Sequence, residues 1–367
     1  MIIFADSIFN YLHRFNNKPK VYMPKIKVAV LGATGSVGQK FIQLLEDHPF
    51  FELCELGASD RSAGKKYKDA VNWFMASPIP NGVGDLIVKN CEPPFESKII
   101  FSGLDSSVAG EIEENFAKAG YIVVSNSRNH RFDPDVPLLV PEVNADHLQL
   151  LPIQKYNGGA IVTNPNCSTI GMVMALKPLY DNFGLEAVNV VTMQALSGAG
   201  YPGVSGLDST DNVIPFISGE EEKLETEPLK ILGSFNGNGI THTDLKISAS
   251  TNRVPVLDGH TESIQVKLKN NASKADILKV WEEFSAEPQV LELPFAPIKP
   301  LHYFHEDKYP QPRLHRNIDK GMVTSIGRLR DCNLFDYKFT VLSHNTVRGA
   351  AGGAILCAEL MVKKGLI

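Results

Sequence analysis

The sequence predicts an α/β protein with an N-terminal, Rossmann-type parallel sheet and a second, α+β domain built on a mixed sheet. Up to about residue 150, apolar strand-like runs alternate with helix-like segments, a pattern typical of a parallel sheet covered on both faces. The later strand-like runs are longer, and their helices are grouped between them, as in α+β domains. The length of 367 residues accommodates two domains of roughly 150 residues each.

The first domain is expected to comprise residues 24–157. It opens with an apolar, β-rich strand at 25–31, which a glycine-rich turn joins to a helix over 39–45. Further strands are predicted in FELCELGAS, IIFSGL and YIVVS, with a helix in EIEENFAKAG. Residues 1–23 are interpreted as an N-terminal extension, because they have neither the apolar run nor the small-residue cleavage site of a secretory signal.

The second domain is expected over residues 158–344. A helix predicted from 168 to 183 precedes long strand-like runs in VNVVTMQAL, ITHTDLKISASTNRVPV and HTESIQVKLKN. An amphipathic helix, ASKADILKVWEEFSA, and two more strands, GMVTSIGRLR and FDYKFTVLSH, follow. Residues 345–367 carry apolar side chains at helical spacing and are expected to pack back on the first domain.

Composition argues against several classes of protein. The 36 Lys and Arg residues are outnumbered by 41 Asp and Glu, for a net charge of −5, so a nucleic-acid-binding or acidic-membrane surface is not expected. No run approaches the roughly 18 apolar residues of a membrane span. The cysteines are odd in number and contain no CxxC pair, which argues against a disulfide framework or a structural zinc site and favours a reduced, cytoplasmic protein. They are Cys54, Cys91, Cys167, Cys332 and Cys357.

A phosphate-binding loop is predicted at GATGSVG. Gly32, Gly35 and Gly38 follow a strand and open a helix. Glycines there allow a sharp turn and a close backbone approach to a pyrophosphate, while the helix N-terminus supplies free N–H groups. The alternative is a tight turn that binds no ligand.

The choice of cofactor depends on the end of the second strand, where an acidic residue would favour the ribose diol of NAD. Here Arg61 lies between Ser59 and Ser62, and this set can hold the 2′-phosphate of NADP. Asp60 argues the other way if its side chain faces the ribose. NADP is favoured, and the alternative is a solvated charged loop.

A candidate nucleophile is Cys167 in TNPNCST, where a strand and a Pro turn precede a helix. A helix N-terminus lowers the pKa of a thiol and offers amides for an oxyanion hole. The alternative is a buried structural cysteine. The candidate base is His260, which follows Gly259 at the start of a strand. Sequence spacing alone does not bring the two together.

No metal site is expected. Three histidines lie close together in the Pro-rich segment near residue 305, but their spacing fits no standard ligand motif. These are His302, His305 and His315.

Eight segments together resemble the aspartate-semialdehyde dehydrogenase family, in particular its archaeal and fungal branch. They are GATGSVG, ASDRSAGKKY, SNSRNHR, NPNCST, QALSGAG, GEEEK, NRVPVLDGH and NTVRGAAGG. The resemblance runs in order from about residue 25 to the C-terminus. It implies reversible, NADP-dependent reductive dephosphorylation of L-aspartyl-4-phosphate to L-aspartate 4-semialdehyde, a step shared by lysine, threonine and methionine biosynthesis.

By this resemblance, Cys167 is the nucleophile that forms an acyl thioester, His260 is the general acid/base, and Gln194 orients the thioester. The implied substrate carries a carboxylate, an ammonium and a phosphate, which require a bidentate cation, an anion and a phosphate pocket. The residues implied to bind these groups are Arg253 for the carboxylate, Glu220 for the ammonium, and Lys223, Arg128 and Asn129 for the phosphate.

The resemblance also implies the residues that line the cofactor. They are Gly32, Thr34, Gly35, Ser36, Val37, Gly38, Ser59, Arg61, Ser62, Ser102, Ser197, Gly198, Asn345 and Thr346. The protein is expected to form a homodimer or homotetramer through the sheet of its second domain.

Two other functions stay open. A malonyl-CoA reductase would use the same scaffold but has no substrate ammonium for Glu220 to bind. A cofactor-binding regulator would keep the fold without turnover, although the set of Cys167, His260 and Arg253 argues against it.

Overall fold

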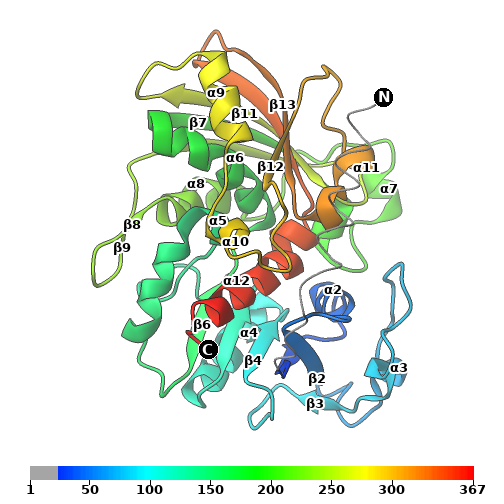
Figure 1. Ribbon diagram of the computed structural model, residues 1–367. Coiled ribbons are helices and arrows are strands. Elements are labelled where there is room, and N and C mark those ends of the chain that lie inside the picture. The colour runs from blue at the N-terminus through cyan, green and yellow to red at the C-terminus, as the bar shows by residue number, and fades with distance from the viewer. Residues whose placement is uncertain (1–23) are drawn as a thin grey trace, which may run out of the picture.

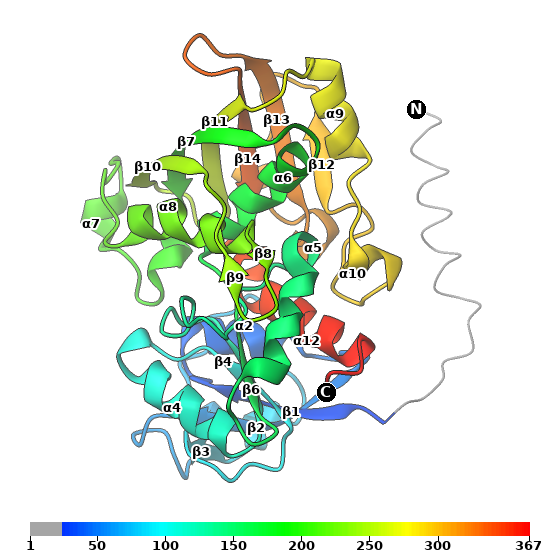
Figure 2. The ribbon, with the colours of Figure 1, turned by 90° about the vertical axis from the view of Figure 1, so that its left-hand side faces the viewer.

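The structure is a computed structural model that describes residues 24–367, so the predicted N-terminal extension lies outside the described residues. In Figures 1 and 2 the first sheet forms the lower lobe and the second sheet the upper lobe. The α5 (Pro141–Asn144) and α12 (Gly352–Lys363) helices contact one another where the lobes meet. The predicted α/β class, with a parallel and a mixed sheet, is confirmed.

The first sheet has six parallel strands in the order β3-β2-β1-β4-β5-β6. These are β1 (Ile26–Leu31), β2 (Phe51–Ala58), β3 (Val88–Asn90), β4 (Ile99–Ser102), β5 (Ile122–Ser125) and β6 (Ala160–Thr163). Strand order reverses between β1 and β4, and ligands of open α/β sheets bind at such a reversal, beyond the carboxyl ends of the strands.

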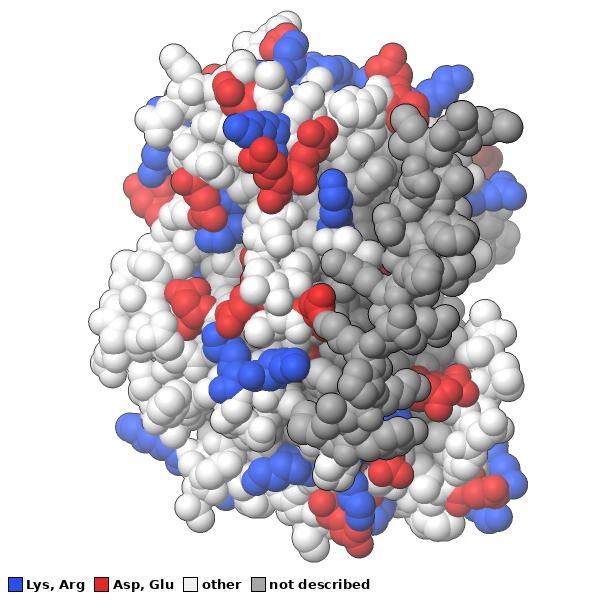
Figure 3. Space-filling model, viewed as in Figure 1, with Lys and Arg blue, Asp and Glu red and all other residues white. Residues whose placement is uncertain are grey.

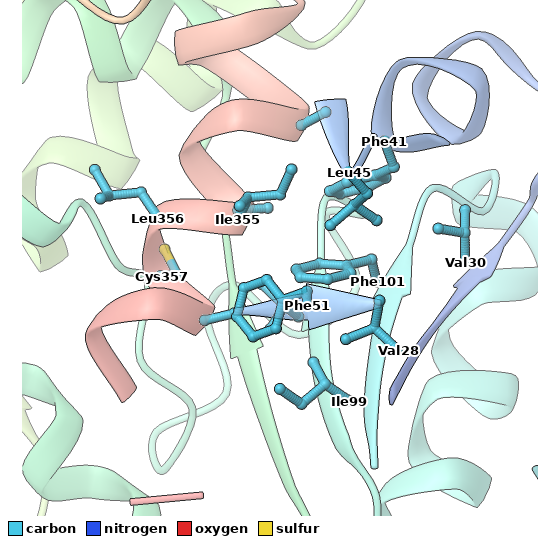
Figure 4. Packing of buried hydrophobic residues seen from close by; sticks show 14 of the residues in the cluster. Val28, Val30, Phe41, Leu45, Phe51, Ile99, Phe101, Ile355, Leu356 and Cys357 are labelled. Carbon is cyan, nitrogen blue, oxygen red and sulfur yellow. The ribbon is translucent and has the colours of Figure 1, made fainter. Parts of the chain in front are cut away.

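Helices cover both faces of this sheet, because every other strand residue points to the same side. On one face, side chains of β1, β2 and β4 meet those of α2 (Ser36–Leu44) and α12, as Figure 4 shows. The rings of Phe41 and Phe101 stack there at 5.1 Å. On the other face, Phe116 of α4 (Ser106–Lys118) packs against Ala29 and Ile100. The remaining helices of this part are α3 (Tyr67–Ala70), η1 (Val83–Asp85) and η2 (Ala145–Ile153).

One predicted boundary differs from the structure. Residues 158–163 were expected in the second domain, yet β6 lies in the first sheet, paired in parallel with β5. Its residues are all buried, so they complete the first core. The chain enters the second part only with α6 (Cys167–Phe183).

The second sheet also has six strands, in the order β10-β7-β11-β14-β13-β12. These are β7 (Leu185–Gln194), β10 (Lys246–Arg253), β11 (His260–Leu268), β12 (Leu301–Phe304), β13 (Thr324–Asp331) and β14 (Tyr337–Ser343). The β10–β7 and β12–β13 pairs are parallel and the others antiparallel. A separate hairpin consists of β8 (Ser234–Phe235) and β9 (Ile240–Thr241).

The helices α6, α8 (Glu220–Ile231) and α9 (Lys274–Glu282) pack against the second sheet. Val190, Ile264 and Val341 are fully buried in the core that includes α6 residues. The intervening strand residues are half-buried, which leaves the opposite face of the sheet partly accessible. Short helices occupy the connections, namely η3 (Leu196–Ala199), α7 (Gly206–Ser209), α10 (Glu287–Val290), α11 (Pro312–His315), η4 (Ile318–Gly321) and η5 (Val347–Ala351).

Charges are mixed over the surface. On the face in Figure 3, Lys and Arg side chains are interspersed with Asp and Glu. Among residues 24–367, no helix combines the length and apolar content that a bilayer crossing needs.

Candidate active site

Cys167 is the first residue of α6, where it follows a strand and a Pro turn. The side-chain oxygen of Asn166 caps the helix by accepting the amides of Ser168 and Thr169, at 2.9 and 3.3 Å. Gly349 of η5 approaches from the other side: a Cβ there would lie 2.7 Å from the Cβ of Cys167. Cys167 is therefore held between its own helix cap and a glycine that no other residue could replace without displacement of its neighbours.

The structure brings Cys167 and His260 together. The Sγ of Cys167 lies 3.2 Å from Nε2 of His260. The other ring nitrogen, Nδ1, accepts the backbone N–H of Ala195 at 3.0 Å. A backbone N–H can only donate, so Nδ1 carries no proton, and a neutral imidazole must carry its proton on Nε2, facing the sulfur.

Burial, followed by the charge of Arg253, lowers the pKa of His260 to about 3. A protonated ring would also point an Nδ1 proton at the Ala195 amide. At neutral pH His260 is therefore an uncharged hydrogen-bond donor to Cys167.

The predicted low pKa of Cys167 is wrong. Burial, then the negative charge of Glu220, raises the pKa of the thiol to about 12, against the opposing charges of Arg131, Arg253 and Lys223. The amides of Ser168 and Thr169 donate to the Asn166 side chain, so these two do not donate to the sulfur. The Cys167 thiol is therefore uncharged at neutral pH.

Strand register explains how distant residues meet at this site. Arg253 pairs with Gln194, and His260 pairs with Ser343. The register that places Thr261 opposite Met193 brings His260 opposite Gln194. Arg253, Gln194 and His260 thus form one row across β10, β7 and β11, at the end of the sheet nearest Cys167. Side chains in one such row lie on the same face of a sheet.

Glu220 and Lys223 of α8 lie on the same side of this pocket. The two side chains form an ion pair at 2.7 Å. The other oxygen of Glu220 accepts from the amides of Asn166 at 2.8 Å and Gln194 at 3.3 Å. Burial alone would raise the pKa of Glu220, but Lys223 and these hydrogen bonds together lower it. Glu220 is therefore a buried anion directed at the nucleophile loop.

Arg253 reaches the same pocket. Its Nη1 donates to the Ala195 carbonyl at 2.7 Å. A Cβ on Gly198 would lie 2.8 Å from this Nη1 and 3.2 Å from His260 Nε2. The predicted cofactor residue Gly198 thus lies against both groups, which places the expected cofactor loop beside the reacting atoms.

Arg128 and Asn129 lie elsewhere. Both side chains are exposed. Asn129 donates to the Ser106 carbonyl, and Arg128 is near enough to Asp105 to contribute to its lowered pKa. Apart from the Ser127 hydroxyl, which donates to the Asn129 side chain, their contacts are with the start of α4. The same loop contains Arg131, whose charge acts on Cys167. The sequence analysis missed this residue.

Arg131 is buried, with only 6% of its surface exposed. Its Nη1 pairs with Glu227 at 2.6 Å, and its Nη2 donates to the Asn126 carbonyl at 2.9 Å. Its Nε has no partner among the described residues. Arg131 is the second arginine of the segment SNSRNHR. The sequence alone does not show which of the two arginines in this segment points into the protein.

The glycine-rich loop has the geometry of a phosphate cradle. Gly32 has a φ of +69°, and a Cβ there would lie 2.6 Å from the Gly103 carbonyl oxygen. A Cβ on Gly38 would lie 2.2 Å from the Gly32 oxygen, so this glycine allows α2 to pack on the turn. Gly35 is exposed and precedes Ser36, and α2 has no side-chain cap. The free N-terminus of α2 thus fits a pyrophosphate.

The other loop residues frame this cradle. The Thr34 carbonyl accepts from the Gln39 side chain at 3.0 Å, while Val37 is half-buried and contacts the first core. Gly103, which follows β4, closes the loop from the neighbouring strand. This places the cradle at the reversal of strand order between β1 and β4.

The predicted cofactor-selecting residues follow β2, beside the glycine loop. Ser59 and Arg61 are exposed, and the Ser62 amide donates to the Ser59 carbonyl at 2.8 Å. Arg61 is thus free to meet a ligand. Ser102 is different, because its hydroxyl is buried and donates to Glu113 at 2.6 Å. Ser102 as a whole has no exposed surface, so the expected contact with a cofactor finds no accessible atom of this residue.

Asn345 connects the catalytic loops. Its side chain accepts the Gly259 amide at 2.8 Å and donates to the Ser197 hydroxyl at 2.8 Å. Thr346 follows it at the start of η5. Residues from three separate segments therefore lie together beside His260. Within residues 24–367 no group of three His, Cys, Asp or Glu side chains could hold a metal ion.

Two family models match the chain. "Semialdehyde dehydrogenase, NAD binding domain" matches residues 27–151, and "Semialdehyde dehydrogenase, dimerisation domain" matches residues 176–348. The aspartate-semialdehyde dehydrogenase of Archaeoglobus fulgidus is 50% identical over 347 residues, which are 94% of this chain and 100% of that protein. The chain belongs to the aspartate-semialdehyde dehydrogenase family. The predicted resemblance is confirmed.

Other members of the aspartate-semialdehyde dehydrogenase family agree with this assignment. The Schizosaccharomyces pombe protein is 50% identical over 353 residues, covering 93% of this chain and 99% of its own. A crystal structure of the Candida albicans enzyme with NADP has a TM-score of 0.88 at 45% identity, over 93% of this chain and 100% of that one. A Vibrio cholerae enzyme complexed with ASA has a TM-score of 0.73 at 26% identity, over 93% of this chain and 99% of that one.

Proposed function

We propose that this chain catalyses the reversible, NADP-dependent reductive dephosphorylation of L-aspartyl-4-phosphate to L-aspartate 4-semialdehyde. The observation that carries the proposal is the contact of 3.2 Å between Cys167 Sγ and His260 Nε2, in a chain of this family. The surrounding charges match the substrate: Arg253 for its carboxylate, Glu220 for its ammonium, and Lys223 for its phosphate.

In the phosphate site we assign Arg131 the role that the resemblance gave to Arg128. Arg131 is buried near the nucleophile and keeps an unpaired Nε, whereas Arg128 is exposed beside α4. Buried guanidinium groups bind phosphate well because their donors match its geometry. Asn129 supports the loop through its bond to Ser106.

The first step needs no separate base. The Cys167 sulfur attacks the acyl carbon, the carbon–oxygen bond to phosphate breaks, and the thiol proton leaves with the phosphate as HPO₄²⁻. The Nε2–H of His260 donates to the sulfur and stabilises the negative charge that develops on it during proton loss. Gln194, in the row next to His260, would orient the thioester.

The pyrophosphate of the cofactor would bind at the free N-terminus of α2, next to Gly32, Gly35 and Gly38. Three further residues would lie beside the reacting carbon, namely Ser197, Gly198 and Asn345. NADPH, when bound, supplies the hydride that reduces the acyl carbon. As the carbon–sulfur bond breaks, the sulfur leaves as a thiolate that takes a proton from solvent. The His260 Nε2–H stabilises this charge too, so we narrow its role from general acid/base to hydrogen-bond donor.

The test is an assay of phosphate-dependent NADP reduction with aspartate semialdehyde, run beside succinate and malonate semialdehydes. Activity that requires phosphate and prefers the substrate with an ammonium group supports the proposal. Faster reduction of malonyl-CoA than of aspartyl phosphate would favour the acyl-CoA reductase instead, and absence of turnover with all of them would favour a regulator.

Arg61→Glu is expected to shift cofactor preference from NADP towards NAD by roughly tenfold or more, because Arg61 would bind the 2′-phosphate and a carboxylate would bind the ribose diol. The measurement is kcat/KM for each cofactor. Lys118→Glu, the same charge change at the far end of α4, is the control and should leave the ratio unchanged. An unchanged ratio in Arg61→Glu would show that the phosphate is bound elsewhere.

We propose that a second copy of the chain covers the open face of the second sheet. Ser263 pairs with Val191 on one side and Thr340 on the other, and all three are half-buried on the face away from the α6 core. Antiparallel sheets commonly leave one face open to solvent, so this row is accessible to a partner. The match of residues 176–348 to a dimerisation domain supports this interface. Homodimer and homotetramer both fit it.

Ser263→Lys is expected to convert the oligomer to monomers, because it introduces a charge at the centre of the interface on both copies. Light scattering after size-exclusion chromatography should show at least twice the chain mass for the parent and the chain mass for the variant. Glu111→Lys, on the exposed side of α4, is the control. A variant that keeps the parent's mass would place the interface elsewhere.

We further assign residues 24–166 with 345–367 to the cofactor domain and residues 167–344 to the catalytic domain. This extends the predicted limit of the cofactor domain from 157 to 166, so that it includes β6.

Five free cysteines fit a reducing compartment, and we propose the cytoplasm as the place of action.

A further inference from the structure

Glu227 lies at the centre of a buried network and has no role in the reaction described above. It is on α8 and has no exposed surface. Its Oε1 accepts from Arg131 Nη1 at 2.6 Å, and its Oε2 accepts the backbone N–H of Asn166 at 2.7 Å. One carboxylate thus joins the buried arginine to the peptide immediately before the nucleophile.

Asn166 is held by α8 at two points. Glu227 accepts its backbone amide, and Glu220 accepts its side-chain amide at 2.8 Å. The two glutamates are seven residues apart, or about two helical turns, and therefore share one face of α8. Since the Asn166 side-chain oxygen caps α6, this face of α8 determines the orientation of the first turn of α6, which begins with Cys167.

Arg131 is held by the same helix face. Lys230, one turn after Glu227, donates to the carbonyls of Arg131, Asp133 and Val136, each at 2.8 Å. The backbone of the loop is therefore fixed by Lys230 and the guanidinium of Arg131 by Glu227. Without the Glu227 carboxylate, the guanidinium would keep one carbonyl partner, Asn126.

We propose that Glu227 is a positioning residue that aligns the nucleophile with the phosphate site. It fixes the Asn166 peptide and the Arg131 guanidinium relative to each other, so that the sulfur meets the acyl carbon while the departing phosphate stays on Arg131. This inference rests on the proposed function and extends it to a residue that touches neither substrate nor cofactor. The alternative is a buried ion pair that only stabilises the fold.

The test compares Glu227→Gln with Glu222→Gln, the same change at an exposed position of the same helix. The side-chain carbonyl of the introduced glutamine can still accept the Asn166 amide, but its NH₂ group would face Arg131 Nη1 and displace the guanidinium. We expect kcat to fall by roughly 10–100-fold, as for other small misalignments of reacting groups. KM for phosphate should rise at least about threefold through loss of the charge-assisted contact, with KM for aspartate semialdehyde unchanged.

Glu227→Asp keeps the charge with a shorter reach and should restore part of kcat relative to Glu227→Gln; it also carries the test if the Gln variant does not fold. Circular dichroism and the melting temperature report folding for each variant. A folded Glu227→Gln with parental kcat and phosphate KM, or a loss of activity that merely follows the fraction unfolded, would overturn the positioning role. A parent enzyme without phosphate-dependent turnover would instead overturn the proposed function.

Discussion

Cys167→Ser is expected to lower kcat by at least about 10⁴-fold, the scale on which loss of a covalent nucleophile acts. A serine hydroxyl is a much weaker nucleophile and a much weaker acid than a thiol, so it passes its proton to the departing phosphate far less readily, and the Nε2–H of His260 can only donate and gives no help. The measurement is the rate of phosphate-dependent NADP reduction.

The matched control is Cys332→Ser, at a half-buried position after β13, which should keep parental activity. Intact-protein mass spectrometry of the parent mixed with aspartyl phosphate, without NADPH, should detect an acyl adduct that Cys167→Ser lacks. More than a few per cent of parental turnover in Cys167→Ser would contradict a thioester at this position.

His260→Ala is expected to lower kcat by roughly 10²–10³-fold, the usual cost of removing one donor to a developing negative charge. His260→Gln should recover part of this loss, because its amide can donate to the sulfur as Nε2–H does. A Gln side chain cannot act as a base. Equal and complete loss in both variants would therefore favour proton transfer by the imidazole over hydrogen-bond donation.

The pH profile separates the same two roles. A His260 with a pKa of about 3 is neutral at every pH above about 4, so the parent should show no loss of kcat/KM through its titration between pH 5 and 8. A limb near pH 6.5 that disappears in His260→Gln would mean that the imidazole titrates during catalysis, as a general base does.

Local sequence signals were sufficient for the elements that carry the chemistry. GATGSVG predicts a strand, a turn and a helix because glycine is required where φ is positive or a neighbouring backbone is close, and Gly32 and Gly38 have these constraints. NPNCST predicts a cysteine at a helix start because Asn is a strong N-cap, and Asn166 caps α6. Both signals act within a few residues, so they can be read before the fold is known.

Other features depended on which elements pack together. Arg128 and Arg131 are three residues apart in one loop, and only the position of α8, with Glu227 and Lys230, makes the second one the buried cation. The sequence could not show whether β6 is the last strand of the first sheet or the first strand of the second domain. A short buried strand has the same apolar pattern in either sheet.

The sequence by itself determined the class of fold, the glycine loop, the candidate nucleophile and the family, because each is encoded in the kind and order of residues along the chain and not in contacts between distant segments. The tertiary structure decided the protonation states. The Ala195 amide places the His260 proton on Nε2, and burial keeps the Cys167 thiol neutral. Hydrogen-bond direction and desolvation are properties of an enclosed site, and they exist only once β7, β11, α6 and α8 have come together.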